Sequence, residues 1–358
     1  MFELNSAGLN WPRGVMILDV LLVPLVVFWS IGHEEYLVSA ALGAVFSAVA
    51  DPGGSYGSRV SRLAVFALIG AGLTAAGFAI GGEAGGWLVL ATFGVTLVAS
   101  LTIMFGLHAA VAALLLNFQF IISLALAYNF HHKHHTSHTW AQVVAWAAGS
   151  TLWIALTFIW WLIHRRQDRP QPIAEMPGDT SRHPLTRPVL MYAVLRAAVI
   201  AGAGALAFGL NLSHGQWLIF GAFAAMKPRV GPTTVTSTQR LIGALIGAGA
   251  AALLLLIPAN EHGKTLVSIT HGLQVVAIVL MMHAVATFFY NYAIFQAAFV
   301  AAVLILVDLL QPGNYGAEGY RLLWTLCGVA MATVVMALAA LLARSAAEGP
   351  PQPAQQAA

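Results

Sequence analysis

Charged side chains are scarce in this chain. Asp, Glu, Lys and Arg make up 8% of its 358 residues, hydrophobic residues make up 59%, and the mean hydropathy is +0.81. A soluble protein needs charged residues over about a quarter to a third of its surface. The composition therefore excludes a soluble globular protein and indicates a membrane protein that crosses the bilayer many times.

Cysteine and the common catalytic motifs are missing too. The single cysteine, Cys327, lies in an apolar segment, so no disulfide framework or cysteine metal site can form. The sequence contains no phosphate-binding glycine loop and no H-E-x-x-H. The net charge of +3 is small, and no basic stripe indicates nucleic-acid binding. We therefore expect neither an enzyme nor a cofactor, and no nucleic-acid partner.

Apolar segments recur along the whole chain. We expect an all-α polytopic membrane protein with about twelve spans at residues 14–31, 36–50, 63–82, 86–104, 108–128, 141–163, 188–211, 214–226, 241–258, 266–284, 288–310 and 320–344. The run 86–128 would reach roughly 65 Å as one helix, against about 30 Å of hydrocarbon, so it is expected to fold as a hairpin. The run 265–310 is expected to do the same.

Basic residues predict the orientation. With the N-terminus inside, most of the 16 lysines and arginines fall in inner segments, and only Lys133, Lys264 and Arg321 fall in outer loops. The positive-inside rule then places both termini in the cytoplasm. We expect a multi-pass protein of the bacterial inner membrane, surrounded by membrane lipid.

Two stretches of the chain resemble one another. Residues 36–72 and 217–249 each open on an aromatic residue, pass through a short apolar helix to Pro and Gly, and end in Ile-Gly-Ala-Gly. A second likeness starts at His108 (HAAVAALLLN) and His283 (HAVATFFYN), at a similar offset. Because six spans are an even number, we expect two six-helix repeats of the same orientation, related by an axis along the membrane normal.

The repeat defines four regions. We expect a first six-helix repeat at 1–163, a cytoplasmic linker rich in Arg and Pro at 164–187, a second six-helix repeat at 188–345 and a disordered tail at 346–358.

The spans 36–50 and 214–226 are short, so the turns that follow them are expected to lie below the inner surface and to line a wet cavity. Both turns are basic and rich in hydroxyls, which suits a carboxylate substrate. An ordinary pair of inner loops carrying topology charges is the alternative. The substrate-binding candidates are Arg59, Arg62, Lys227, Arg229 and Arg240, with Trp217 and the intramembrane Arg196.

Four residues are candidates for proton coupling. Asp51 and Lys227 precede the prolines of the matching turns. We expect either a static ion pair between them, or that one binds substrate while the other takes a proton. Asp19 lies in the first span near the position equivalent to Arg196. His108 and His283 can relay protons or act as capping and packing groups.

A histidine-rich segment follows the fifth span. His131, His134, His135 and His138 include an H-x-x-H-H spacing like the histidine boxes of membrane di-iron desaturases. Those enzymes need several boxes on the cytosolic side, whereas this chain has one on the expected outer side. Zinc binding and a solvated polar loop are the other interpretations, and we assign no metal.

The segment from His214-Gly215-Gln216-Trp217 through Lys227-Pro228 and Gly231 to Gln239-Arg240-Leu241-Ile242-Gly243 resembles the fusaric-acid-resistance family of membrane proteins. The family motif carries over to Trp217, Pro228, Gly231, Arg240 and Gly243. The first half shows a weaker likeness at Tyr36, Asp51-Pro52, Gly57, Arg62 and Gly70.

The resemblance implies an inner-membrane exporter of small organic anions such as aromatic carboxylic acids, driven by a proton or anion gradient. Aluminium-activated malate channels look like distant relatives, so a passive anion channel is the alternative function. A membrane metalloprotein built on the histidine-rich segment is a further alternative. A periplasmic adaptor protein and a homo-oligomer are the partners that the resemblance leaves open.

Overall fold

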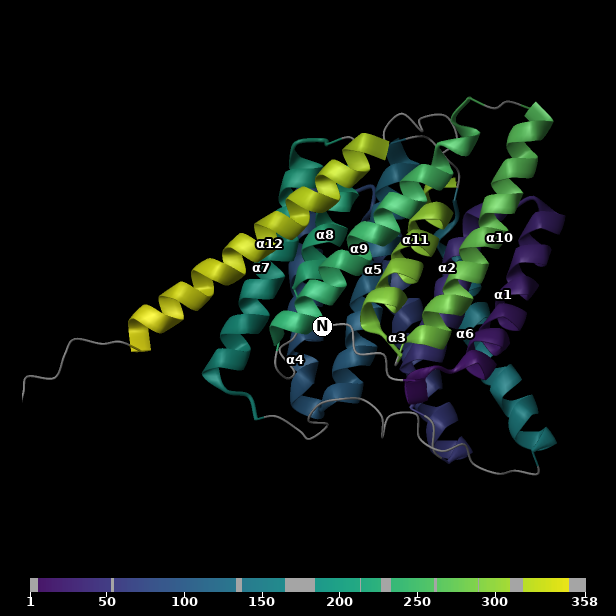
Figure 1. Cartoon of the computed structure of the whole chain (residues 1–358), viewed down its shortest axis with the longest axis horizontal. Coiled ribbons are helices and arrows are strands. Elements are labelled where there is room, and N and C mark those ends of the chain that lie inside the picture. Colours follow the sequence, from purple (N-terminus) through teal and green to yellow (C-terminus); the bar gives the residue numbers. More distant parts are fainter. Residues whose placement is uncertain are drawn as a thin grey trace, which may run out of the picture.

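The computed structural model of the chain describes residues 6–52, 55–132, 137–164, 184–212, 214–226, 233–260, 263–288, 290–309 and 318–347. Within these ranges every regular element is a helix, which confirms the all-α prediction. The α-helices are α1 Trp11–Ile31, α2 Leu37–Ala50, α3 Tyr56–Ile80, α4 Gly85–Leu101, α5 Leu107–His132, α6 Thr139–Ile163, α7 Arg187–Gly209, α8 Gln216–Ala225, α9 Thr233–Leu255, α10 Gly263–Thr287, α11 Tyr292–Leu309 and α12 Glu318–Ala347 (Figure 1).

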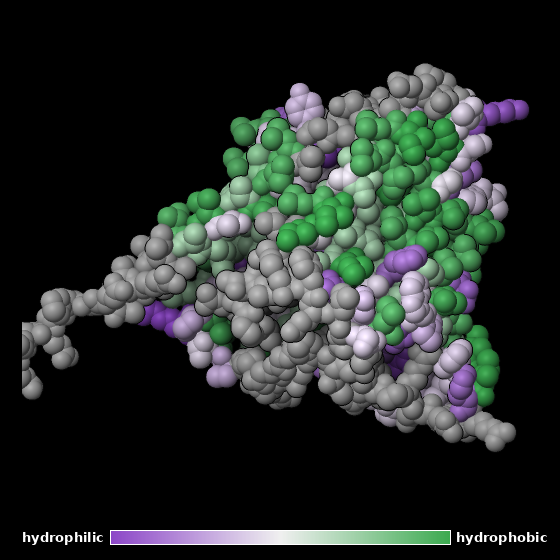
Figure 2. Space-filling view, viewed as in Figure 1, coloured by the Kyte–Doolittle hydropathy of each residue, from purple (hydrophilic) through white to green (hydrophobic). Residues whose placement is uncertain are grey.

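Seven helical segments in this part of the chain are long and apolar enough to cross a membrane. They are α1, α3, α4 with the short helix after it, α5, α6, α7 and α10, and their most apolar windows have mean hydropathies of 1.6 to 2.4. Large apolar side chains point outward from them; Leu68 is 72% exposed and Val98 is 66% exposed. Figure 2 shows apolar side chains over much of the described surface. The chain is thus a multi-pass membrane protein, and twelve crossings in two repeats stay a prediction.

Glycines and prolines set the helix ends. In α1, the Asn10 side chain accepts a 3.0 Å hydrogen bond from the Arg13 backbone N–H, and Pro12 occupies the first turn. Gly32 ends α1 in the left-handed conformation at φ 69°. The run 86–128 turns before α5 at Gly106, whose φ is 102°, and the run 265–310 divides into α10 and α11. Both predicted hairpins are therefore confirmed.

The two short helices lie at the centre of the bundle. α2 has 14 residues, and every residue from Leu37 to Val49 is buried. α8 has 10 residues and is buried from Gln216 to Phe223. At about 1.5 Å per residue they reach roughly 21 and 15 Å, less than the hydrocarbon thickness of about 30 Å. The other helices surround them, so neither needs to meet lipid along its length.

Close glycine contacts join each short helix to one long partner. Gly43 of α2 and Gly149 of α6 each approach the other helix so closely that a β-carbon would strike its backbone. Gly221 of α8 and Gly328 of α12 do the same. Thus α2 packs on α6 as α8 packs on α12. This matched packing supports the predicted repeat.

The helices of the two predicted halves are interleaved. α1 packs along α10, and α7 packs along α4. At the start of α1, the Asn10 backbone N–H donates a 2.9 Å hydrogen bond to the Ala286 carbonyl of α10. Each half therefore contributes one helix to the outer layer of the other, so the halves form one assembly rather than two separate bundles.

We expect alanine at Gly149 or Gly328 to destabilise the fold by about 1–3 kcal/mol, because the added methyl group overlaps a backbone carbonyl that cannot move freely. Gly94→Ala is the matched control, since no atom lies within 4 Å of a β-carbon at that helical position. Unfolding midpoints in detergent, followed by tryptophan fluorescence, would measure the effect. Equal midpoints for Gly149→Ala and Gly94→Ala would contradict the close packing of α2 on α6.

Candidate functional site

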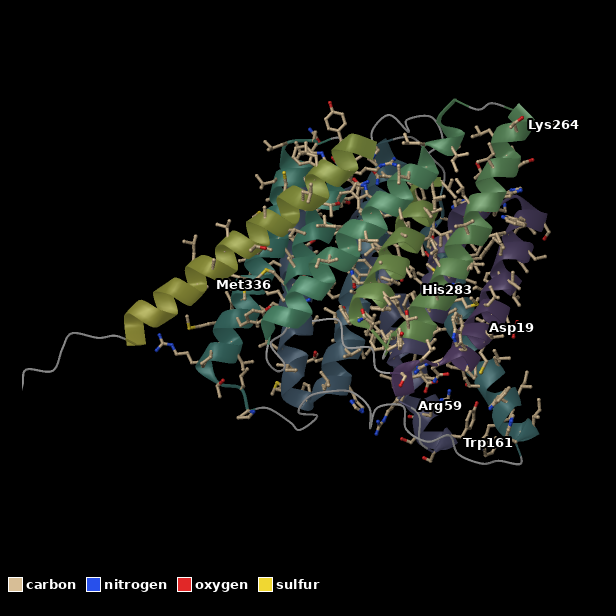
Figure 3. All side chains as sticks on the ribbon, viewed as in Figure 1. Asp19, Arg59, Trp161, Lys264, His283 and Met336 are labelled. Carbon is tan, nitrogen blue, oxygen red and sulfur yellow. The ribbon has the colours of Figure 1, made fainter. Side chains whose placement is uncertain are left out.

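The candidate residues fall at two ends of the bundle and in its middle. Arg59 and Trp161 mark one end, here the Arg59 end, and Lys264 marks the opposite end, here the Lys264 end (Figure 3). The turn after α2 lies at the Arg59 end, and the connection between α1 and α2 lies at the Lys264 end.

A buried ion pair closes the end of α2. Asp51 follows the last residue of α2, and the Arg59 Nε lies 2.6 Å from its Oδ1, with a second contact from the guanidinium to Oδ2. The Trp153 indole N–H donates to Asp51 Oδ2 at 3.2 Å. Arg59 and Asp51 are both 4% exposed. Each charge is thus taken out of water and compensated by the other.

Arg13 reinforces the same end of α2. Its guanidinium, on a residue only 6% exposed, donates to the Ala48 carbonyl. A cation beside the last carbonyl groups of a helix is stabilising, because those groups carry the negative end of the helix dipole. The sequence predicted separate roles for Arg59 in binding substrate and for Asp51 in binding a proton, whereas the structure joins the two side chains to each other.

The other basic candidates include residues that the structure does not describe. Arg62 is exposed on α3 and close enough to His108 to act on it electrostatically. Lys227 and Arg229 lie outside the described residues, and so does the side chain of Arg240, although its backbone belongs to α9. The predicted pairing of Asp51 with Lys227 is therefore untested, and Arg59 is the partner that the structure gives to Asp51.

Asp19 and Arg196 do not share matching surroundings. Asp19 is exposed on the outward face of α1 (Figure 3), whereas Arg196 of α7 is 1% exposed. Their positions along the sequence indicate near-equivalence, but only Arg196 lies inside the bundle.

The two repeated histidines do not occupy corresponding helices of the two predicted halves. His108 is the second residue of α5, whereas His283 lies near the end of α10. The His283 ring packs edge-on against Trp11 at 5.3 Å, and its Nδ1 lies 2.7 Å from the Val279 carbonyl oxygen. Their predicted equivalence is wrong, because the similar sequence begins at the start of α5 in one case and near the end of α10 in the other. His283 has the contacts of a packing residue.

The histidine-rich segment forms no metal site in the described part of the chain. His131 and His138 are exposed at the ends that flank it, and His134 and His135 lie outside the described residues. Among described residues no group of three or more His, Cys, Asp or Glu side chains could hold a metal ion.

A group of phenylalanines fills the space between the short helices. This phenylalanine cluster comprises Phe46 of α2, Phe118 of α5, Phe220 and Phe223 of α8, and Phe299 of α11. Phe118 is at its centre, with ring centroids 6.2 Å from Phe46, 6.0 Å from Phe299 and 5.2 Å from Phe223, against which it stacks. No sequence pattern predicted the cluster, because its members come from four separate helices.

Buried polar groups run beside the phenylalanine cluster. The Arg196 guanidinium carbon lies 5.2 Å from the centroid of Phe223, and its Nη1 lies 3.3 Å from the Ser100 hydroxyl. One turn away on α4, the Thr96 hydroxyl donates to Asn117 Oδ1 at 3.3 Å. Asn117 directly precedes Phe118 on α5. A cation, two hydroxyls and an amide thus follow one side of the aromatic rings.

Two donors near the phenylalanine cluster lack hydrogen-bond partners among the described residues. They are the Asn117 Nδ2 and the indole Nε1 of Trp217, whose side chains belong to residues 1% and 3% exposed. The Trp217 ring also packs edge-on against Phe220 at 5.0 Å. A buried donor without an acceptor is costly in a membrane protein, so its presence calls for a water or a ligand. We call Arg196, Asn117, Trp217 and the phenylalanine cluster the central site.

Comparison with known proteins finds one family match. Residues 200–335 match the family described as fusaric acid resistance protein-like, which confirms the resemblance found in the sequence. The match runs from α7 into α12 and includes Trp217 and α8. No curated protein and no solved structure matches the chain at a significant level.

Proposed function

Because residues 200–335 match the fusaric acid resistance protein-like family, we propose that the chain is a membrane transporter that exports small organic anions. Aromatic carboxylic acids are the proposed substrates, and a proton or anion gradient is the proposed driving force. The observation that carries this proposal is the buried guanidinium of Arg196 beside the phenylalanine cluster.

The central site offers the two kinds of contact that an aromatic carboxylate needs. Phenylalanine rings receive another aromatic ring by offset or edge-on packing. Arg196 supplies a charge-assisted hydrogen bond to the carboxylate, and Asn117 Nδ2 supplies a neutral donor. In this water-poor setting the cation attracts an anion strongly and repels an amine.

We further propose two six-helix halves that move relative to one another around the central site. In the phenylalanine cluster, Phe46 and Phe118 belong to the first predicted half, and the other three phenylalanines belong to the second. The matched glycine contacts of α2 with α6 and of α8 with α12 support this division. In such transporters the substrate site lies at the interface of the repeats, and access alternates as they rock.

The Arg59 end is the proposed cytoplasmic side. This orientation follows from the excess of basic residues in the segments assigned to that side. Arg62 is exposed there, and we propose that Arg62, Lys227 and Arg229 raise the local concentration of anions, while Arg240 binds the carboxylate directly. Substrate then passes from these residues to Arg196 and leaves at the Lys264 end.

Arg240 provides a test in cells. We expect Arg240→Ala to abolish efflux of labelled 4-hydroxybenzoate and Arg240→Lys to weaken it, because lysine keeps the charge but loses the planar fork that fits a carboxylate. Arg344→Ala, near the end of α12, is the control and should leave efflux unchanged. Efflux would be followed in preloaded cells at matched membrane expression. Full efflux in Arg240→Ala would return the basic turns to the role of topology signals.

A passive anion channel is the second candidate function, because an arginine beside aromatic rings can also select a permeating anion. Electrical recording from planar bilayers separates the two functions. A current whose reversal potential follows the anion gradient alone would favour the channel. Accumulation against the anion gradient would favour the transporter.

A further inference from the structure

A hydrogen-bonded network at the Lys264 end joins the two predicted halves. Glu34, in the connection between α1 and α2, binds two residues of α10: His271 Nε2 lies 2.9 Å from Oε1, and Gln274 Nε2 donates to Oε2 at 2.5 Å. The Trp29 indole N–H donates to Gln274 Oε1 at 2.5 Å. The paired residues are 237 to 245 positions apart in the sequence.

The network holds its carboxylate and imidazole in one arrangement while leaving them open to water. Both oxygens of Glu34 are bound by α10, and the His271 ring stacks on Trp29 with centroids 4.5 Å apart. The side chains of His271 and Glu34 are 34% and 30% exposed. Glu34 lies in the connection outside α1 and α2, so water at the Lys264 end can reach its carboxylate.

We propose that Glu34 and His271 form the proton-binding site that couples transport to a proton gradient. This inference rests on the proposed transport function and adds the residues that bind the driving ion. A proton that binds the Glu34 carboxylate removes its negative charge and turns one acceptor oxygen into a donor. The contacts to His271 and Gln274 then weaken, so proton occupancy changes the attachment of α10 to the α1–α2 connection.

The other charged groups near Glu34 and His271 do not link the two predicted halves in the described part of the chain. His33 and Glu35 pair with each other at 2.8 Å within the same connection. Lys264 lies at the start of α10, about two turns before His271. Glu261 and the side chain of Asp308 on α11 lie outside the described part of the chain. The charged residues of α1, Arg13 and Asp19, lie nearer the N-terminal end of that helix, away from Glu34. Of the described groups at the Lys264 end, Glu34 and His271 form the ion pair that crosses between the halves.

The earlier candidates fit this role less well. Asp51 is 4% exposed and held by Arg59 and Trp153, so a proton would have to displace a buried ion pair. Asp19 faces outward from the bundle. Among these described candidates, the Glu34–His271 pair alone is both partly exposed at the Lys264 end and in contact with both halves.

Purified full-length protein in liposomes tests the inference through two modes of transport. In the first, a lumen more acidic than the outside drives labelled 4-hydroxybenzoate inward, and leakage of the neutral acid runs the opposite way. In the second, labelled substrate exchanges for unlabelled substrate without a pH gradient. We expect Glu34→Gln and His271→Gln to lose gradient-driven accumulation by about tenfold or more while exchange stays within about twofold.

Glu35→Gln and His33→Gln are matched controls, because they alter the neighbouring pair that does not reach α10. Both should behave as wild type in both modes. Full accumulation in Glu34→Gln would overturn the inference, as would an equal loss in both modes, which indicates a structural role. If wild-type protein exchanges substrate but ignores the pH gradient, the inference fails while the transport function stands. If it moves no substrate at all, both fail.

Discussion

Arg196→Met greatly slows transport of aromatic carboxylates if the central site binds them. Methionine keeps much of the side-chain volume beside Phe223 but removes the guanidinium. A hydrogen bond to a charged group contributes about 1.5–3 kcal/mol, which corresponds to a loss of roughly 10- to 150-fold in transport rate. Arg196→Lys should retain part of the rate, because it keeps a cation without the planar fork. Initial uptake rates in liposomes would measure both variants.

Arg187→Met is the matched control, since Arg187 begins the same helix and is exposed. It should transport at the wild-type rate. A wild-type rate in Arg196→Met as well would show that the buried guanidinium serves packing alone and would remove it from the substrate site.

The second large effect concerns stability. Asp51→Asn should destabilise the protein by about 3–5 kcal/mol, because it leaves the buried Arg59 guanidinium without its counter-charge. The double variant Asp51→Leu with Arg59→Met should recover most of that loss, since two apolar side chains leave no buried charge. Unfolding in detergent, monitored by tryptophan fluorescence, would report both changes.

The double variant also separates two roles of Arg59. If Arg59 only fixes the end of α2, the stable double variant transports normally. If it also receives substrate, the double variant is stable but slow. A double variant as unstable as Asp51→Asn would contradict the view that Asp51 and Arg59 chiefly compensate one another.

The helices themselves were largely predictable, because their ends are set locally. The predicted span 36–50 is observed as α2 at Leu37–Ala50, and the predicted span 214–226 as α8 at Gln216–Ala225. In both places an apolar run is bounded by Pro and Gly, which stop a helix whatever packs against it. The family resemblance was likewise visible in one continuous segment.

Side-chain pairing was not predictable, because it depends on which helices meet. The sequence marked Asp51 and Arg59 as separate candidates, and the first turn of α3 brings Arg59 to Asp51; the predicted pairing of Asp51 with Lys227 stays a prediction, because Lys227 lies outside the described residues. Glu34 and His271 are 237 residues apart and meet because α1 packs along α10. Their chemistry was present in the sequence, but no local spacing marked it.

Uptake of labelled 4-hydroxybenzoate by liposomes that contain the purified chain tests the central claim most directly. The account predicts saturable uptake above that of protein-free liposomes, inhibited by unlabelled aromatic carboxylates and unaffected by benzylamine, which carries a cation on a similar ring. Uptake equal to that of protein-free liposomes, or equal inhibition by benzylamine, would contradict an anion transporter built around Arg196.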